Sequence, residues 1–422
     1  MIVSRAIAVA LLAASASVHA AVPSPAALAD VDKIFAEWQL AAHVPGLVYG
    51  VVVDGRLVHV RGLGVQDVET RSPVTPDTLF RIASMSKAFT ALAILKLRDE
   101  GKVSLDAPAE LYVPELRGWK GPTTDSPRIT VRNLMRPLGM TATGYDVFAS
   151  PQARRAIGYR WQDNGWQREP DMKDGAFGAM GGVETSANDY ARWVAFLLSA
   201  WPARDGPDQG PVPRGTVRQI VTGSNFVIAS MRNPAAGGTP CRQARTYAMG
   251  WSVTDDCDLG TIVSHSGGYP GYGSNVLLLP SKGVGIFAFS SKTYGAASLP
   301  NLRAALSLAK NGALADRLIP TDAGLALAYD AARAVWRSGD IASAPLANNM
   351  LMDHDAAGWR ELVDGVKADV GSGAATEPVT PVSAMEGKFR WTCERGRVVG
   401  RVQRAPTPSI TLQALEFAVD VP

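Results

Sequence analysis

Two groups of short apolar strands, far apart in the chain, constrain its fold most strongly. The first group is a pair of strands over 47–53 and 57–62, joined by Asp54-Gly55, a dipeptide that favours the tight turn of a β-hairpin. The second group follows about 190 residues later, with short turns between predicted strands over 247–253, 261–265, 275–279 and 284–289. Short turns join antiparallel strands, because a parallel connection needs a dozen or more residues. The chain is therefore expected to contain an antiparallel sheet.

Helices are predicted before, between and after these strands. Apolar residues recur at helical spacing over 26–43, and a second helix is predicted from Ser84 to Glu100, followed by Gly101 as its left-handed end. A third helix is predicted to begin after Ser186, which caps it. Further helices are predicted over 302–309, 323–337 and 356–370. This order indicates an α+β fold with an antiparallel sheet flanked by helices, and it excludes a doubly wound parallel sheet.

The first twenty residues have the pattern of an export signal. Arg5 precedes a short apolar run, and small residues stand at Val18 and Ala20, the two positions that a signal peptidase reads. The apolar run is too short to span a bilayer, which needs about 20 residues. We therefore expect an exported protein, periplasmic or secreted, with no transmembrane segment once the signal is removed.

The composition limits the classes of function. A hydrophobic content of 46% and a charged content of 19% are those of a globular protein, and 422 residues suffice for two or three domains. A net charge of +3 gives no electrostatic reason to expect nucleic acid. The histidines show no metal-ligand spacing, so we expect no metal and no cofactor. Neither a Walker loop nor a Gly-x-Ser-x-Gly elbow is present, which argues against an NTPase and an α/β-hydrolase.

A serine and a lysine at the start of one predicted helix could form a catalytic pair. Ser84 and Lys87 are three residues apart, so they lie on one face of the helix. A serine hydroxyl needs a nearby base to become a nucleophile, and a partly desolvated amine can serve, because burial lowers its pKa. Backbone N–H groups at a helix start also stabilise a developing oxyanion. The same spacing occurs by chance, with the serine as a cap and the lysine in solvent, so the pair alone leaves both interpretations open.

Three stretches, in the same order as in the family, resemble the serine β-lactamase and penicillin-binding protein superfamily, most closely its class-C-like esterase and peptidase branch. They are residues 80–116 around the Ser-x-x-Lys pair, residues 178–189 with a Gly-Gly loop and a helix cap, and residues 247–272 with Tyr-Ala-Met-Gly-Trp and His-Ser-Gly-Gly. The resemblance covers roughly residues 26–315. It implies the β-lactamase/transpeptidase-like fold and a serine hydrolase activity that needs no cofactor.

The resemblance also implies a role for each matched residue. Ser84 would be the acylated nucleophile, Lys87 its base partner, and His265 would face the carboxylate or acyl portion of the substrate. The residues expected to bind substrate or to form the oxyanion hole are Ser84, Ser266, Gly267 and Gly268. Glycines suit this strand, because its backbone must approach the substrate closely. Without the family, His265 at the end of an apolar strand is better explained as an ordinary edge or core residue than as a catalytic one.

One element of the family is missing. Relatives carry a Tyr-x-Asn or Ser-x-Asn motif in the helical domain, but none of the ten tyrosines here has Asn two positions later. Ser186-Ala187-Asn188 fits in letters but is better explained as a helix cap. In relatives a long stretch follows the segment that corresponds to 129–135, whereas here Pro-Leu-Gly-Met-Thr follows at 137–141. The sequence therefore predicts a deletion near residues 135/136 and a shortened helical domain.

Three hypotheses for function follow. The first is a serine hydrolase that cleaves an amide or ester of a small molecule or peptide through acyl-Ser84; the substrate would be a D-Ala-D-Ala-type peptide, a β-lactam or a small carboxylic ester, and His265 in place of Lys favours an ester or peptide. The second is an impaired or inactive homologue that binds cell-wall fragments or a partner, since the deletion would leave Lys87 more solvated, near its ordinary pKa of about 10.4. The third is a truncated product that folds poorly. The oligomeric state is left open.

The cysteines and the domain boundaries complete the predictions. Cys241 and Cys257 are expected to form a local disulfide, and Cys393, which alternates with apolar residues, is expected to be a buried thiol. Residues 371–381 have the composition of a linker. The predicted division is a signal peptide over 1–20, a β-lactamase-like hydrolase domain over 21–315 and a small C-terminal α+β module with a β-rich end over 316–422.

Overall fold

The computed structural model describes residues 22–105, 107, 111–112, 140, 142–145, 154–172, 178–223, 225–373 and 375–420. The predicted signal at 1–20 and the predicted deletion near 135/136 lie outside the described residues. Within these ranges, no helix is both long enough and apolar enough to cross a bilayer.

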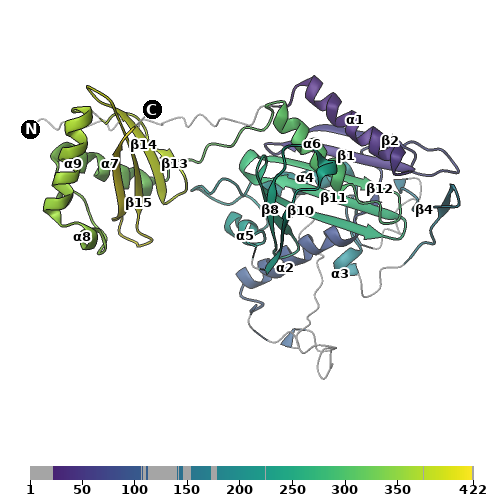
Figure 1. Cartoon of the computed structure of the whole chain (residues 1–422). Coiled ribbons are helices and arrows are strands. Elements are labelled where there is room, and N and C mark those ends of the chain that lie inside the picture. Colours follow the sequence, from purple (N-terminus) through teal and green to yellow (C-terminus); the bar gives the residue numbers. More distant parts are fainter. Residues whose placement is uncertain are drawn as a thin grey trace, which may run out of the picture.

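An antiparallel sheet of eight strands forms the larger part of the molecule (Figure 1). Its strand order is β2-β1-β12-β11-β10-β9-β8-β7. The strands are β1 Gly46–Val53, β2 Arg56–Gly64, β7 Asn225–Met231, β8 Arg242–Tyr247, β9 Ser252–Asp256, β10 Gly260–Tyr269, β11 Tyr272–Leu279 and β12 Val284–Ser290. The N-terminal hairpin thus pairs with the end of the meander, through β1 and β12. This pairing brings segments more than 200 residues apart into one sheet.

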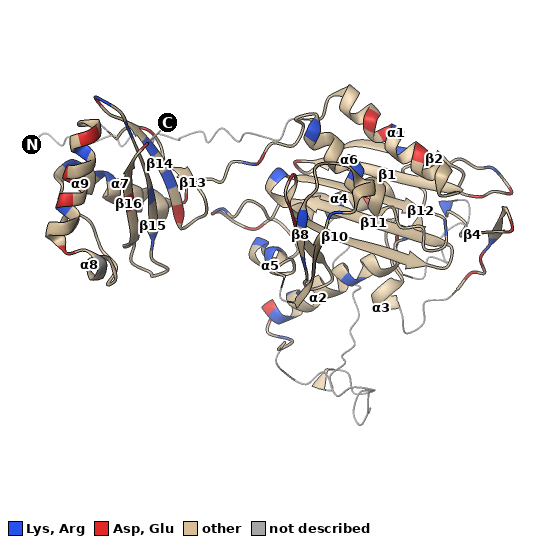
Figure 2. Ribbon diagram, in the orientation of Figure 1, with Lys and Arg blue, Asp and Glu red and all other residues tan. Residues whose placement is uncertain are grey.

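Helices cover both faces of this sheet. One face packs against α1 (Pro25–Ala41) and α6 (Ser298–Lys310), and the other against α2 (Ser86–Asp99) and α4 (Ala187–Leu198). β1 serves both cores, because alternate side chains of a strand point to opposite faces. The central strands β1, β11 and β12 carry no charged residue (Figure 2). The predicted α+β fold, an antiparallel sheet flanked by helices, is confirmed.

Shorter elements connect the strands and helices of this part of the chain. A two-stranded sheet pairs β3 with β6, and a hairpin joins β4 to β5. The bounds are β3 Phe80–Arg81, η1 Ala83–Met85, β4 Tyr159–Gln162, β5 Gly165–Arg168, α3 Gly178–Gly181, β6 Glu184–Thr185, α5 Arg214–Gln219, η8 Pro234–Ala236 and η9 Pro280–Lys282, where η denotes a 3-10 turn.

The C-terminal residues form a second sheet with its own core. The strand order is β13-β14-β15-β16, and α7 and α9 contribute apolar side chains to the core of this sheet. The elements are α7 Ala323–Ser338, η10 Ile341–Ser343, α8 Met350–Asp353, α9 Ala356–Val370, β13 Thr380–Pro381, β14 Glu386–Thr392, β15 Arg397–Arg404 and β16 Leu412–Val419. Large aromatic residues fill the core, among them Trp336, Phe389, Trp391 and Phe417. No residue of this core belongs to the cores of the large sheet.

Three local predictions are wrong. Residues 247–253 are not one strand: the chain turns where Ala248 N donates to Trp251 O, and Gly250 has a φ of 77° that glycine tolerates. Residues 371–381 are not a free linker, because Ala375 is only 1% exposed. Cys393 is half-buried and not fully buried. The composition of a segment indicates whether it can turn, but the burial of the segment depends on which distant residues pack against it.

Candidate active site

Ser84 and Lys87 stand together at the start of α2. Ser84 lies in the 3-10 turn η1, directly before the helix, and Lys87 lies in its first turn. Lys87 Nζ is 2.6 Å from Ser84 Oγ, within hydrogen-bond distance. Ala83, just before the serine, has a φ of 47°, a left-handed conformation that is uncommon for alanine. The serine therefore sits on a tight and constrained turn with an amine beside its hydroxyl.

A buried serine holds this turn in place. Ser86 is 0% exposed, and its hydroxyl donates to the carbonyl oxygen of Ala83 at 2.7 Å. The same hydroxyl accepts from the backbone N–H of Val183 at 3.1 Å, and Ile82 N donates to Val183 O at 2.9 Å. The segment before β6 thus fixes the turn that carries Ser84.

Lys87 is half-buried, and this burial lowers the pKa of its amine below the usual value. A lowered pKa leaves more of the neutral amine, which can accept a proton. The turn at residues 248–251 packs against the backbone of Lys87: a Cβ on Gly250 would lie 3.0 Å from the carbonyl oxygen of Lys87. The pKa of Lys87 is thus lowered and does not stay at the ordinary value expected of a more solvated amine.

Strand β10 runs beside the nucleophile turn. A Cβ on Gly267 would lie 2.2 Å from the carbonyl oxygen of Ile82, so only glycine allows this approach. Ser274, from β11, donates to the same carbonyl oxygen at 2.7 Å. At Gly268, a Cβ would lie 2.6 Å from the ring of Tyr294, which covers that glycine. The structure thus brings the predicted strand Ser266–Gly268 against the Ser84 turn.

His265 stands on the same strand and makes two polar contacts. Its Nε2 is 3.1 Å from the hydroxyl of Tyr247, and its Nδ1 is 2.7 Å from the carbonyl oxygen of Ser266. Burial is the main cause that lowers the pKa of His265, and the charge of Lys87 lowers it further. The three predicted residues Ser84, Lys87 and His265 therefore share one electrostatic environment.

Two buried asparagines brace β10 from behind. Asn275 Nδ2 donates to Ser266 Oγ at 2.9 Å and to the carbonyl oxygen of His265 at 3.2 Å. Asn301, from α6 and 0% exposed, donates in turn to the carbonyl oxygen of Asn275 at 3.1 Å. Ser266 thus has a fixed hydroxyl, and the backbone of His265 is tied to the core.

Two further features near the site were not predicted. Glu184 on β6 lies between two buried arginines, 3.2 Å from Arg81 and 3.3 Å from Arg155, and all three side chains are at most 5% exposed. Arg81 also lies over the ring of Tyr269, 4.9 Å from its centroid. Tyr247, the partner of His265, belongs to the Tyr-Ala-Met-Gly-Trp match, but only the folded sheet shows that contact. The neighbouring residues of a sequence cannot reveal either cluster.

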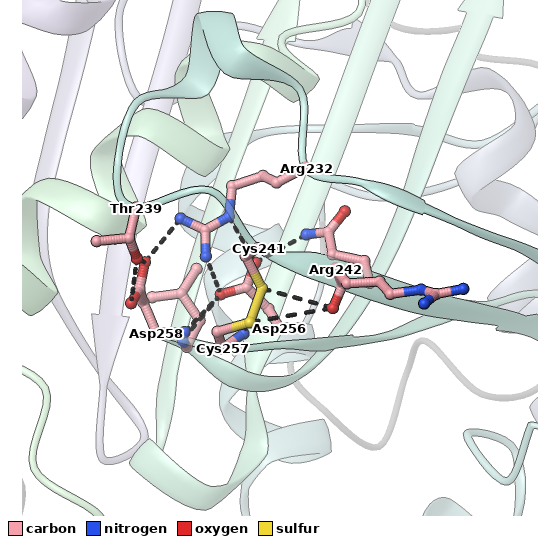
Figure 3. Close-up of polar contacts among 9 residues, drawn as sticks. Arg232, Thr239, Cys241, Arg242, Asp256, Cys257 and Asp258 are labelled. Carbon is pink, nitrogen blue, oxygen red and sulfur yellow. Dashed lines mark hydrogen bonds and ion pairs between the residues drawn. A yellow bond between two sulfur atoms is a disulfide. The ribbon is translucent and has the colours of Figure 1, made fainter.

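The far ends of β7, β8 and β9 are joined by a disulfide and an ion cluster (Figure 3). Cys241 and Cys257 form the disulfide that the sequence suggested. Beside it, the buried Arg232 donates to Asp256 at 2.8 Å and to Asp258 at 2.7 Å. β8 runs from this clamped end to Tyr247, so the clamp restrains the strand that carries the partner of His265.

Other candidate sites are not supported. Ser186 caps α4, because its hydroxyl accepts from Asp189 N at 3.2 Å, and Asn188 contacts Asp77 instead of the site. Ser186-Ala187-Asn188 is thus a helix cap, as predicted. Among the residues that the structure describes, no three His, Cys, Asp or Glu side chains are grouped as metal ligands.

Solved structures share this fold. A D-alanine carboxypeptidase AmpC from Burkholderia cenocepacia aligns with a TM-score of 0.52 and 20% identity, over 67% of this chain and 98% of that one. A beta-lactamase from Sulfitobacter sp. EE-36 aligns with a TM-score of 0.51 and 19% identity, over 69% and 99% of the two chains. At these identities the likeness concerns the fold alone.

Similar sequences cover parts of the chain. The human serine beta-lactamase-like protein LACTB, mitochondrial (Homo sapiens) is 54% identical over 71 residues, which are 17% of this chain and 13% of that protein. Protein flp of Staphylococcus aureus (strain NCTC 8325 / PS 47) is 30% identical over 338 residues, 62% of each chain. The chain thus spans less than two thirds of the length of either relative. The Beta-lactamase family model matches residues 31–136 and 134–310, well over half of the chain, and the chain therefore belongs to that family, the β-lactamase-like serine hydrolases.

Proposed function

We propose that this protein is a serine hydrolase that cleaves an ester or amide bond through an acyl-Ser84 intermediate. The observation that carries the proposal is the 2.6 Å contact between Lys87 Nζ and Ser84 Oγ. It is supported by the burial that lowers the pKa of Lys87, since a neutral amine is the form that can activate a hydroxyl. Membership of the β-lactamase-like superfamily agrees with this chemistry.

The proposed reaction has two steps. In the first, the neutral amine of Lys87 takes the hydroxyl proton of Ser84 while Oγ bonds to the acyl carbon, and the leaving group departs with a proton returned by the ammonium. The backbone N–H groups of Ser84 and Gly268 stabilise the oxyanion. In the second step, water bonds to the acyl carbon and gives up a proton, the bond between that carbon and Oγ breaks, Oγ takes the proton to restore the Ser84 hydroxyl, and the acid is released.

The proposed substrate is a small molecule or a peptide with an acyl group that fits beside β10. A D-Ala-D-Ala-type peptide is one candidate, in keeping with the D-alanine carboxypeptidase among the similar structures. A small carboxylic ester is another. His265 in place of the lysine of many β-lactamases favours both over a β-lactam. We further propose that residues 1–20 direct export to the periplasm or the medium, and that residues 21–315 form the hydrolase domain.

An impaired homologue is the second candidate, and one observation favours it. The family model matches in two pieces that meet at residues 134–136, where the sequence predicts the deletion. If deacylation depends on the lost segment, the enzyme would acylate and then release product slowly. Residues 316–422 would then assist in binding cell-wall fragments or a partner.

Intact-protein mass spectrometry tests both candidates. The protein is incubated with a fluorophosphonate and, separately, with a penicillin, and Ser84→Ala serves as the matched control. One adduct that is absent from Ser84→Ala is expected. No adduct on the folded protein would sink the hydrolase proposal, and an adduct that persists for hours would favour the impaired homologue. A thermal melt confirms that the protein is folded: a non-cooperative transition would favour a truncated product that folds poorly.

A further inference from the structure

The two hydrogen bonds on His265 define which nitrogen of its ring carries the proton. Nδ1 is 2.7 Å from the carbonyl oxygen of Ser266, and a carbonyl oxygen only accepts, so Nδ1 donates. The pKa of His265 is lowered, chiefly by burial and in smaller part by the charge of Lys87, although the hydrogen bond to Ser266 raises it; the lowered pKa favours the neutral ring. A neutral ring with its proton on Nδ1 has a lone pair on Nε2. The hydroxyl of Tyr247, 3.1 Å away, is therefore the donor to Nε2.

The backbone of Tyr247 is fixed on both sides, and the residue is 36% exposed. It is the last residue of β8 and pairs with Asn225 on one side and Ser252 on the other. Its ring meets the imidazole edge-on, with centroids 6.1 Å apart. The turn that follows is anchored through Met249 N, which donates to Ile220 O at 3.2 Å, and through Gly250, which packs against the backbone of Lys87. The disulfide fixes the opposite end of the strand (Figure 3).

This arrangement limits what His265 offers a substrate. Its Nδ1 proton is used by a backbone carbonyl, and its Nε2 is an acceptor that already receives the Tyr247 hydroxyl. The ring thus presents neither a free N–H nor a positive charge to the cleft. A carboxylate on the acyl portion of a substrate needs a free N–H, a positive charge or both to bind. It only accepts hydrogen bonds, and it binds most strongly to a charged donor.

We propose that Tyr247 is a specificity-determining positioning residue: it holds His265 in the Nδ1–H tautomer, so that the site prefers substrates with an uncharged acyl portion over those with a carboxylate there. The inference rests on the proposed acyl-Ser84 chemistry, and it goes beyond it by naming the class of acyl group. It narrows the expectation that His265 faces the carboxylate or acyl portion of the substrate.

The preference depends on pH with a definite sign. Two titratable groups of the described residues act on the imidazole, the Tyr247 hydroxyl from β8 and the Lys87 amine from α2. Below the lowered pKa of His265 the ring gains a proton on Nε2 and a positive charge, and a substrate carboxylate can replace the Tyr247 hydroxyl as the acceptor of that proton. The preference for uncharged acyl groups should therefore shrink as the pH falls. Removing the phenol donor takes away a hydrogen bond to the neutral ring, which raises the pKa of His265 and moves this change to higher pH.

A pair of esters with one leaving group measures the preference. The neutral substrate is p-nitrophenyl butyrate, and the charged one is the mono-p-nitrophenyl ester of glutaric acid. Rates are taken from the acylation burst, so that slow product release does not obscure them. The ratio of kcat/KM for the neutral over the charged ester is expected to fall about tenfold between about pH 8 and about pH 5, the worth of one charge-assisted hydrogen bond. In Tyr247→Phe the ratio should fall by the same amount but over a higher pH range. In His265→Gln the ratio should not depend on pH.

The outcomes separate this inference from the proposed function. Absence of fluorophosphonate labelling at Ser84 in the unaltered protein would overturn the hydrolase proposal alone. A ratio that does not change with pH, or that is the same in Tyr247→Phe, would overturn the role of Tyr247. Long-range 15N–1H NMR of the histidine ring gives a readout that needs no variant and no turnover. A proton on Nδ1 is expected at neutral pH, and a proton on Nε2 would refute the assignment.

Discussion

Gly250→Ala is the substitution that most directly tests how the site is held together. Gly250 has a φ of 77°, and a Cβ there would lie 3.0 Å from both the carbonyl carbon and the carbonyl oxygen of Lys87. Contacts that short are made with backbone, which cannot rotate away. Either the turn or the start of α2 must move, and these two segments carry Tyr247 and Lys87.

The expected loss in the free energy of unfolding of Gly250→Ala has two parts, and a second glycine of the sheet serves as a control for one of them. An alanine in the left-handed region costs about 1–2 kcal/mol, and overpacking against a rigid neighbour adds about 1–3 kcal/mol. Gly260, in the β9–β10 turn of the same sheet, has a φ of 71° with no atom within 4 Å of an added Cβ. Gly260→Ala should therefore lose only the first part of the free energy of unfolding, and Gly250→Ala the sum, about 2–5 kcal/mol.

Urea unfolding and the rate of fluorophosphonate labelling, measured on both variants, check this reasoning. We expect Gly260→Ala to label at the unaltered rate and Gly250→Ala to label more slowly, since a shift of the start of α2 would move Lys87 relative to Ser84. Equal losses of stability in the two variants would refute the claim that the contact with Lys87 matters. Normal labelling in a destabilised Gly250→Ala would show that the turn supports the fold without supporting the chemistry.

Other predictions concern the amine, the pH dependence and two buried clusters. Lys87→Met should slow labelling of Ser84 by about 10²- to 10⁴-fold, and an unchanged rate would exclude Lys87 as the base. The labelling rate of the unaltered protein should rise with pH and level off below 10.5, the ordinary pKa of lysine, because the neutral amine is the active form and burial lowers the pKa of Lys87; a rise that continues past that value would contradict this. Replacing Cys241 and Cys257, 16 residues apart, with serine should lower the free energy of unfolding by about 2–4 kcal/mol in urea, and an unchanged value would mean that the ion cluster alone fixes this end of the sheet. Glu184→Gln should cost about 3–5 kcal/mol, since it removes the carboxylate that two buried guanidinium groups contact, and a loss below about 1 kcal/mol would show that the pair adds little.

Local patterns in the sequence predicted the parts of the fold that depend on local physics. The hairpin turn at Asp54-Gly55 has positive φ at both residues, as that dipeptide favours, and Ser186 caps α4 as its spacing to Asp189 indicated. The Ser84–Lys87 contact is of the same kind, because three residues of a helical turn set its distance. Each of these features is determined by residues within one turn of each other.

Contacts between distant segments could not be predicted from the sequence. Tyr247 and His265 stand 18 residues apart, and only the register of β8, β9 and β10 brings them together. The predicted single strand over 247–253 did not indicate this contact, because it placed Tyr247 and Ser252 in one strand and not in the paired strands β8 and β9. Strand β7 was missed as well: it is exposed along its whole length at the edge of the sheet, so it lacks the alternation of buried and exposed residues that marks a strand.

The predicted deletion in the helical domain should affect the two steps of the proposed reaction differently. The proposed acylation uses Ser84 and Lys87, and the Gly250 turn packs against the backbone of Lys87; all of these come from described segments outside the predicted deletion. If deacylation depends on a group from the segment that the sequence predicts to be deleted, water attacks acyl-Ser84 more slowly than Ser84 attacks the substrate. The two steps should therefore separate in time. A burst of about one leaving group per protein molecule, followed by a slow steady rate, is the kinetic form that this arrangement predicts.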